Sequence, residues 1–366
     1  MTNADLLSKT ISYLRFPLIV GVVFIHNKMA SIPIQGKEIN YGEQWPWINY
    51  IIDFFSDVLP TICVPLCFII SGYLFFYKVD FSKDVFKKKL ERRCQTLLVP
   101  YLIWNFIGFL ILLTQMHPRF LSLFPLLKDY RIDITEFLSY FWAKHLPMDT
   151  GVNPTMPIDF PFWYVRDLLL LVIASPIVYY LIRKCKIFFI IVLSCIWFFH
   201  LAKYIGLSDQ SHQSILFFPL GAYLSINRIN FVVIANKLKW SPYVYAVLAI
   251  GDTMTKGEAF NYWLHNFGII FGLIAVVYIA SLLLAKDKVH INKFLSDASF
   301  FVFAAHGLFI SKFMKALVMT VQPQSPFIVL CIFFFVPIAT ILICLGMYQL
   351  LSKSTPNLAR ILTGRR

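Results

Sequence analysis

Long apolar stretches recur along the whole of this 366-residue chain. Hydrophobic residues make up 58% of the sequence and charged residues 14%, whereas a soluble domain is nearer half apolar and a quarter charged. A run of about 20 apolar residues spans a bilayer as a helix, which satisfies its own backbone hydrogen bonds. The sequence therefore predicts an all-α, polytopic integral membrane protein with about ten transmembrane helices. Their expected ranges are roughly 12–31, 50–77, 97–115, 162–182, 187–204, 213–226, 241–252, 262–285, 297–320 and 327–351. The sixth and seventh are short, and an alternative count merges or drops that pair without changing the orientation of the termini.

Basic residues are unevenly distributed between the connecting segments, which indicates the orientation in the membrane. The formal net charge is +14, and 21 of the 33 Lys and Arg residues fall in alternate segments, whereas the intervening loops hold six. By the positive-inside rule the basic set is cytoplasmic, so both termini are expected there. Nucleic-acid binding is disfavoured because the charges are scattered over inter-helix loops. The basic segments are 1–11, 78–95, 183–186, 227–241, 286–296 and 353–366.

Nothing in the composition divides the chain into separate domains. Residues 1–352 are expected to form a single transmembrane domain, followed by a short basic cytoplasmic tail, 353–366. The first apolar stretch lacks a clear cleavage site and is interpreted as an uncleaved helix. The proline-rich loop 116–161 is predicted to lie outside, as an ordered cap or a substrate-contacting loop rather than a separate domain. The seven cysteines have no metal-ligand spacing, so no metal site is expected.

Arg15 and His26 lie in the first apolar span, in the run SYLRFPLIVGVVFIHN. An eleven-residue helical step is three turns and about 20°, so the two side chains should share a face, about 16 Å apart along the axis. A neutral imidazole accepts protons, which makes His26 a candidate general base, whereas Arg15 can only bind or orient anionic groups. The alternative is a packing histidine and an arginine that snorkels to the interface.

The densest basic stretch, residues 78–101, runs into an apolar span. As a helix it would place Lys89 and Arg93 on one side and Arg92 on the neighbouring side, at the membrane surface. Such a cluster can hold phosphates through charge-assisted hydrogen bonds. The competing interpretation, strongest for the lysines, is that these charges set topology and contact anionic lipid.

Several other polar residues in or beside the spans are candidates for lining a cavity. His306 lies inside an apolar run, and a packing role is an equal alternative. Arg166 and Asp167 start a span, and as helix neighbours they need not pair with each other. Trp163 and Tyr164 fit an interfacial aromatic anchor. The remaining candidates are Asp57, as a partner for the cations, and Ser71, where the pair with Gly72 could kink the second span.

Four segments together resemble the acyltransferase 3 family of integral-membrane acyltransferases. They are Arg15-x10-His26, VPLCFIISGYLFF at 64–76, ERRCQTLLVPY at 91–101 and FWYVRDLLLL at 162–171, with SFFVFAAHGLFIS at 299–311 as a looser match. The ordered set spans nearly the whole chain. It looks most like the shorter members without an appended extracytoplasmic domain, which include sugar and polysaccharide O-acetyltransferases. No nucleotide-binding or serine-hydrolase motif competes with it.

The resemblance implies a ten-helix enzyme of the bacterial inner membrane. It would move an acyl group, acetyl being favoured, from cytoplasmic acyl-CoA to a hydroxyl of a cell-surface glycan or lipid-linked sugar. Acyl-CoA would be a co-substrate rather than a permanently bound cofactor. The resemblance maps the catalytic pair onto Arg15 and His26 and the phosphate-binding pair onto Arg92 and Arg93. Thr96 stands where the family often has a further arginine, so Lys89 and neighbouring lysines are expected to take part in binding the phosphates.

The leading hypothesis is therefore acyl transfer with His26 as general base. A covalent acyl-histidine intermediate stays open as a variant. The alternative from another class is a transporter or flippase that uses an intramembrane Arg/His relay. The absence of visible inverted repeats weighs modestly against it.

Overall fold

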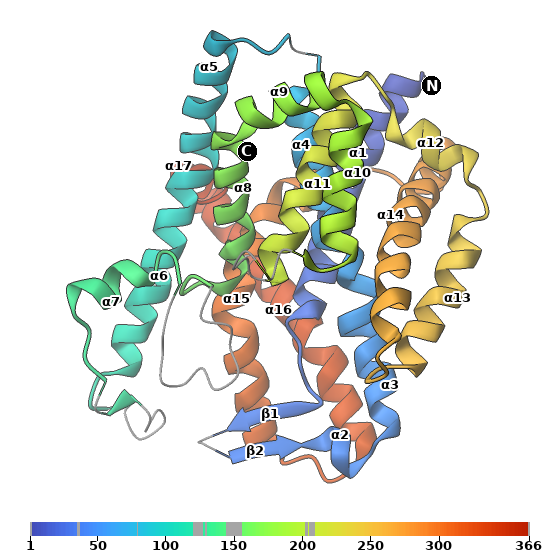
Figure 1. The fold of residues 1–366 in the computed structure, drawn as a ribbon. Helices are drawn as coiled ribbons and strands as arrows, with labels where there is room; N and C mark the ends of the chain where they lie inside the picture. The colour runs from blue at the N-terminus through green and yellow to red at the C-terminus, as the bar shows by residue number, and fades with distance from the viewer. Residues whose placement is uncertain are drawn as a thin grey trace. The chain divides into compact units, whose positions relative to one another are not determined.

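Helices predominate in a computed structural model of the chain, which describes residues 2–34, 37–78, 80–119, 127–128, 130–143, 156–201, 204 and 209–364. An antiparallel hairpin of β1 (Ser31–Ile34) and β2 (Lys37–Asn40) follows the first helix (Figure 1). Much of the predicted outer segment 116–161, part of the connection between the predicted spans 187–204 and 213–226, and the last two residues of the basic tail lie outside the described residues.

Six helical runs among the described residues are long and apolar enough to cross a membrane. Four of them are single helices: α1 (Asn3–Ile25), α14 (Asn261–Ala285), α15 (Lys293–Val321) and α16 (Pro326–Ser354). The run Trp47–Phe76 joins α3 (Trp47–Asp53), the π-helical turn η1 (Phe54–Val58), the 3-10 turn η2 (Leu59–Ile62) and α4 (Cys63–Phe76). The run Lys83–Gln115 joins α5 (Lys83–Arg93), the π-helical turn η3 (Cys94–Leu98) and α6 (Val99–Gln115).

Two bent helix pairs raise this number to at most eight. The α8–α9 pair (Trp163–Ile173 and Ser175–Cys185) bends by 62°, and the α11–α12 pair (Asp209–Ile226 and Phe231–Lys237) by 98°. Two other predicted spans correspond to short helices, α10 (Ile187–Phe198) and α13 (Ser241–Met254). A helix of that length rises only about 20 Å, less than the hydrocarbon thickness. The membrane-spanning helical class is thus confirmed, while the number ten and the orientation stay predictions.

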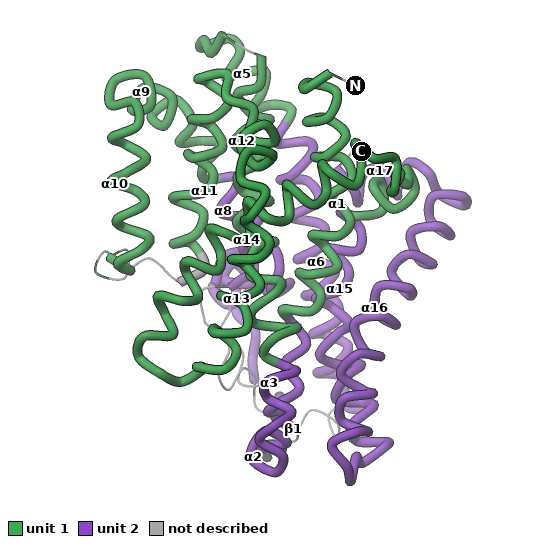
Figure 2. Tube along the Cα trace, turned by 90° about the vertical axis from the view of Figure 1, so that its right-hand side faces the viewer, with its two compact units in different colours: residues 1–25, 53–92, 170–299 green, residues 26–52, 93–169, 300–366 purple. Residues whose placement is uncertain are grey.

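The chain divides into two compact units that interleave in sequence (Figure 2). Unit 1 contains residues 1–25, 53–92 and 170–299, and unit 2 contains residues 26–52, 93–169 and 300–366. The remaining described helices all belong to unit 2 and are α2 (Tyr41–Gln44), α7 (Ile134–Ser139), the 3-10 helix η6 (Phe160–Phe162) and α17 (Pro356–Leu362).

In unit 1, α4 and α11 touch backbone to backbone. A Cβ on Gly72 would lie 2.1 Å from the Phe218 carbonyl oxygen, and one on Gly221 would lie 2.0 Å from that of Ile69. Small residues allow this approach between membrane helices. α4 runs as one helix through Ser71 and Gly72, and the kink that this pair could introduce stays a prediction. Gly72 allows the close approach of α11.

In unit 2, the described part of the predicted cap packs against α6. Leu112, Tyr140 and Ile158 form a buried cluster. The Tyr101 hydroxyl donates a hydrogen bond to the Phe141 carbonyl oxygen. Asp133 caps α7 by accepting from the Glu136 backbone N–H. Leu112 and Tyr101 of α6 thus contact the described part of this segment.

Candidate active site

His26 is the first residue after α1, and in unit 2 its ring contacts two rings from distant parts of the sequence. The imidazole of His306, on α15, stacks on that of His26 with ring centroids 5.5 Å apart and planes 28° apart. The Phe160 ring meets His26 edge-on at 4.6 Å. His26 is half-buried, and His306 is fully buried. The structure thus brings together two of the predicted site residues.

The backbone after His26 is fixed by its neighbour, Asn27. Asn27 is fully buried, and its Nδ2 donates a 2.6 Å hydrogen bond to the Phe333 carbonyl oxygen on α16. In a regular helix that carbonyl would accept from the residue four positions on, but that residue is Pro337, which has no N–H. The proline therefore leaves the Phe333 carbonyl oxygen without its helical donor, and the Asn27 side chain donates to it instead. This contact holds the segment that carries His26.

The two ring nitrogens of His306 differ in their hydrogen bonding. Its Nδ1 lies 3.1 Å from the Val302 carbonyl oxygen one turn earlier in α15. A carbonyl can only accept, so Nδ1 carries the proton and Nε2 presents a lone pair in the neutral ring. Nε2 is buried and has no hydrogen-bond partner in the described part of the chain. A buried acceptor without a partner is costly, which is typical of a functional position.

The segment that carries Phe160 lies directly on α15. A Cβ on Gly307 would lie 2.5 Å from Pro161 Cδ, so only glycine allows this approach. The buried Asp159 donates its backbone N–H to Asn105 Oδ1 at 3.1 Å, and Asn105 Nδ2 donates to the Tyr101 carbonyl oxygen at 2.8 Å. Neither Asn105 nor Asp159 is among the site residues predicted from the sequence. For Asn105, the sequence signal that could have identified it is a side-chain amide inside the apolar run of α6.

Arg166 and Asp167 pair with each other, contrary to the expectation that they need not. Arg166 Nε and Nη2 donate to Asp167 Oδ1 at 3.0 and 2.9 Å, and Nη1 donates to the Trp142 carbonyl oxygen at 2.8 Å. The long guanidinium stem reaches back over the 100° between adjacent positions. Both side chains are buried, and the guanidinium also lies over the Trp142 ring. The pair thereby contacts Trp142, in the described part of the segment 116–161.

The other predicted residues fall elsewhere. Trp163 is buried at 7% exposure, so the predicted surface anchor is wrong for this side chain, and the half-buried Tyr164 ring packs against Phe303. Arg93 is half-buried in unit 2, at the end of α5. In unit 1, Lys89 Nζ donates to the Phe75 carbonyl oxygen. Also in unit 1 are the exposed Arg15 and Arg92 and the half-buried Asp57 and Ser71.

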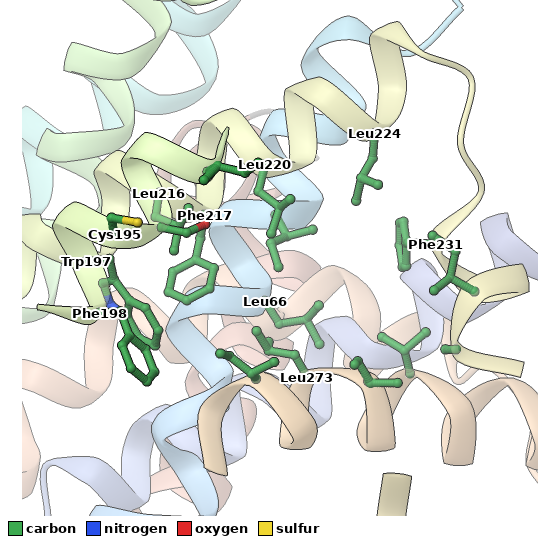
Figure 3. A pocket seen from close by; sticks show the side chains of 18 of the residues that line it. Leu66, Cys195, Trp197, Phe198, Leu216, Phe217, Leu220, Leu224, Phe231 and Leu273 are labelled. Atoms are coloured by element: carbon green, nitrogen blue, oxygen red, sulfur yellow. The ribbon is translucent and has the colours of Figure 1, made fainter. Parts of the chain in front are cut away.

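A hollow of about 540 Å³ in unit 1 lies between α4, α10, α11, α12 and α14 (Figure 3). Leu66, Trp197, Phe217, Phe231 and Leu273 are among its lining residues. No His, Asp, Glu, Lys or Arg of the described chain lines it. It therefore offers no acid–base group, and we do not assign the chemistry to it. Among the described residues there is also no group of three or more His, Cys, Asp or Glu that could hold a metal ion.

Comparison with known proteins identifies the class to which this helical, membrane-spanning chain belongs. The family model of the acyltransferase domain matches residues 9–348, so the chain belongs to the acyltransferase 3 family. It is a multi-pass membrane O-acyltransferase. The family resemblance of the sequence motifs is thereby confirmed.

A particular relative is the Succinoglycan biosynthesis protein ExoH of Rhizobium meliloti (strain 1021). The two sequences are 28% identical over 375 residues, which cover 98% of this chain and 92% of the relative. No solved structure matches the chain.

Proposed function

We propose that this enzyme transfers an acyl group, acetyl in the simplest case, from cytoplasmic acyl-CoA to a hydroxyl of a cell-surface glycan or lipid-linked sugar. The bacterial relative is named for succinoglycan biosynthesis, which supports a polysaccharide or its precursor as acceptor. The same relative and the long apolar helices support a place in the bacterial inner membrane.

The observation that carries the proposal is the setting of His26. It is half-buried, held between the edge of Phe160 and the face of His306, and followed by the anchored Asn27. A general base must be oriented by its neighbours and also reachable by substrate. The ring contacts and the partial exposure of His26 support this role for it, whereas His306 is fully enclosed.

In the proposed reaction the acceptor hydroxyl oxygen attacks the thioester carbonyl carbon while His26 takes the hydroxyl proton. The tetrahedral intermediate then collapses, and the carbon–sulfur bond breaks. The CoA thiolate recovers the proton from the His26 imidazolium, which leaves an ester and free CoA. A positioned general base contributes about 10²–10⁴-fold to the rate of such a step.

Arginines are proposed for the anionic parts of the donor. Arg92 and Arg93 lie at the end of α5, where the polar helix enters the apolar run of α6, and would bind CoA phosphates. Lys89 contributes less, because its ammonium is engaged by the Phe75 carbonyl oxygen. Arg15 would stabilise negative charge that develops during transfer or bind the donor.

The test is acyl transfer by the purified protein in nanodiscs. Acetyl-CoA is supplied with and without the oligosaccharide repeat of the host's own surface glycan, and both free thiol and the mass of the glycan are followed. We expect thiol release that depends on the glycan, and a glycan heavier by one acetyl group. Solute flux through vesicles that contain the protein, with no CoA release from any acyl-CoA, would contradict the proposal and favour the transporter hypothesis.

A further inference from the structure

The apolar hollow of unit 1 has a closed floor and an open rim. Leu66 and Phe217, in its floor, are 1% and 2% exposed, whereas Ile191 and Ile270, at its rim, are 50% and 36% exposed. The helices α4 and α14 beside it belong to runs that are apolar and long enough to cross a membrane. We therefore expect the open side to face the hydrocarbon of the bilayer. Its volume of about 540 Å³ is in the range of pockets that hold small molecules.

One end of the hollow is formed by the last turn of α10. Phe198 lies at this end, and Phe231 lies at the other (Figure 3). Carbonyl groups in the last turn of a helix have no donor within the helix. Here the Tyr262 hydroxyl, on α14, donates to the Phe198 carbonyl oxygen at 3.0 Å. His212 Nε2, on α11, donates to the Ile196 carbonyl oxygen at 3.1 Å. Polar side chains from two other helices thus contact the backbone at this end of the hollow.

These side chains belong to a cluster of rings, Tyr262, His200 and His212, that we call the polar end. The His200 ring centroid lies 4.8 Å from that of His212 and 5.9 Å from that of Tyr262. The Trp263 ring, 39% exposed, packs against Phe198 with centroids 5.2 Å apart. Imidazole and phenol groups both donate and accept hydrogen bonds. The hollow is therefore apolar along its length, with hydrogen-bonding groups and an exposed aromatic ring at one end.

We propose that the hollow binds the acceptor as a lipid-linked sugar, with the hydrocarbon chain in the hollow and the sugar at the polar end. The inference rests on the proposed transfer to a sugar hydroxyl. A lipid tail gains little free energy when it leaves the bilayer for an apolar hollow, so selection depends on the polar group that the chain carries. Sugar hydroxyls match groups that both donate and accept hydrogen bonds. The phosphate of an ordinary phospholipid is bound best by Arg or Lys, and neither lines the hollow in the described part of the chain.

The test is photolabelling of the purified full chain in phosphatidylcholine nanodiscs. The probe is tetradecyl β-D-glucoside with a diazirine in its alkyl chain, and labelled positions are mapped by peptide mass spectrometry. We expect label beside Trp197, Phe217 and Leu273, which line the hollow on α10, α11 and α14. Excess unlabelled tetradecyl glucoside should remove this label, whereas free glucose should not. A phosphatidylcholine with the same diazirine should label these positions at about a tenth of the yield.

Variants connect the label to the hollow and to its polar end. Leu273→Trp fills the hollow and should reduce labelling by the glucoside about tenfold. Ile270→Trp narrows the exposed rim and gives the same test if Leu273→Trp does not fold. Leu342→Trp is the matched control, because Leu342 is 62% exposed on α16 and does not line the hollow. Tyr262→Phe removes one hydroxyl and should weaken glucoside labelling about three- to tenfold while phosphatidylcholine labelling stays the same.

Equal labelling of the hollow by the glucoside and phosphatidylcholine probes would overturn the inference, because any lipid would then fill it. Labelling that is unchanged in folded Leu273→Trp and Ile270→Trp would overturn it as well. So would equal kcat/KM for an oligosaccharide acceptor with and without an attached hydrocarbon chain. Photolabelling requires no acyl-CoA. Selective labelling without any acyl transfer would therefore refute the proposed function and leave the lipid-linked sugar site standing.

Discussion

Asn27 donates a hydrogen bond from its side chain to the backbone carbonyl of Phe333, and this bond links the segment that follows α1 to α16. The bond forms because Pro337 cannot supply the helical donor for that carbonyl. A proline in one part of the sequence thereby creates the acceptor for an asparagine more than three hundred residues earlier. This bond holds the backbone directly after His26 in place.

This relationship predicts coupling between positions 27 and 337. Asn27→Ala leaves the Phe333 carbonyl without a donor in a buried site and should lower the free energy of unfolding by about 1–3 kcal/mol. Pro337→Ala restores a backbone N–H, so Asn27→Ala should cost less in that background. A double-mutant cycle, measured by unfolding in mixed micelles, gives the interaction energy. Strictly additive effects would show that the bond does not depend on the proline.

His306 should act by positioning His26. His306→Gln removes the ring that stacks on His26, and we expect kcat to fall about 10- to 100-fold while the KM for acyl-CoA stays within about twofold. His306→Phe keeps a stacking ring and should recover part of kcat. A simple packing role would instead lower the melting temperature and leave kcat per folded molecule unchanged in both variants.

Gly307 is predicted to be intolerant of any side chain. In Gly307→Ala the new methyl group would meet the rigid Pro161 ring at 2.5 Å, and the resulting shift should destabilise the protein by about 1–3 kcal/mol. Because Phe160 adjoins His26, kcat should fall as well. Gly346→Ala is the matched control, since a Cβ on Gly346 in α16 meets nothing within 4 Å. Equal stabilities of the two variants would contradict the described packing.

The sequence predicted the features that depend on local pattern. Apolar runs placed the helices α1, α14, α15 and α16, and the spacing of motifs identified the family. Apolar length alone could not separate full spans from α10 and α13, which are apolar but short. Likewise, a glycine in an apolar run looks the same in the sequence whether it kinks its own helix or, as Gly72 does, allows another helix to approach closely.

The site required three-dimensional information. His26 and His306 were both singled out because ionisable residues are rare in apolar spans, but nothing local shows that their rings meet. The pairing of Arg166 with Asp167 depends on side-chain reach, which helical spacing does not describe. Asp159 lies outside any periodic segment, so no pattern distinguished it from a loop residue.

The most direct test of the account is the rate of acyl transfer by His26→Gln in nanodiscs. Wild type and variant are compared at saturating acetyl-CoA and glycan, with the Kd for CoA measured on the same preparations to verify folding. We predict that kcat falls by about 10²–10⁴-fold while the Kd for CoA changes less than about twofold. Turnover within a few-fold of the wild type would contradict the assignment of His26 as the general base.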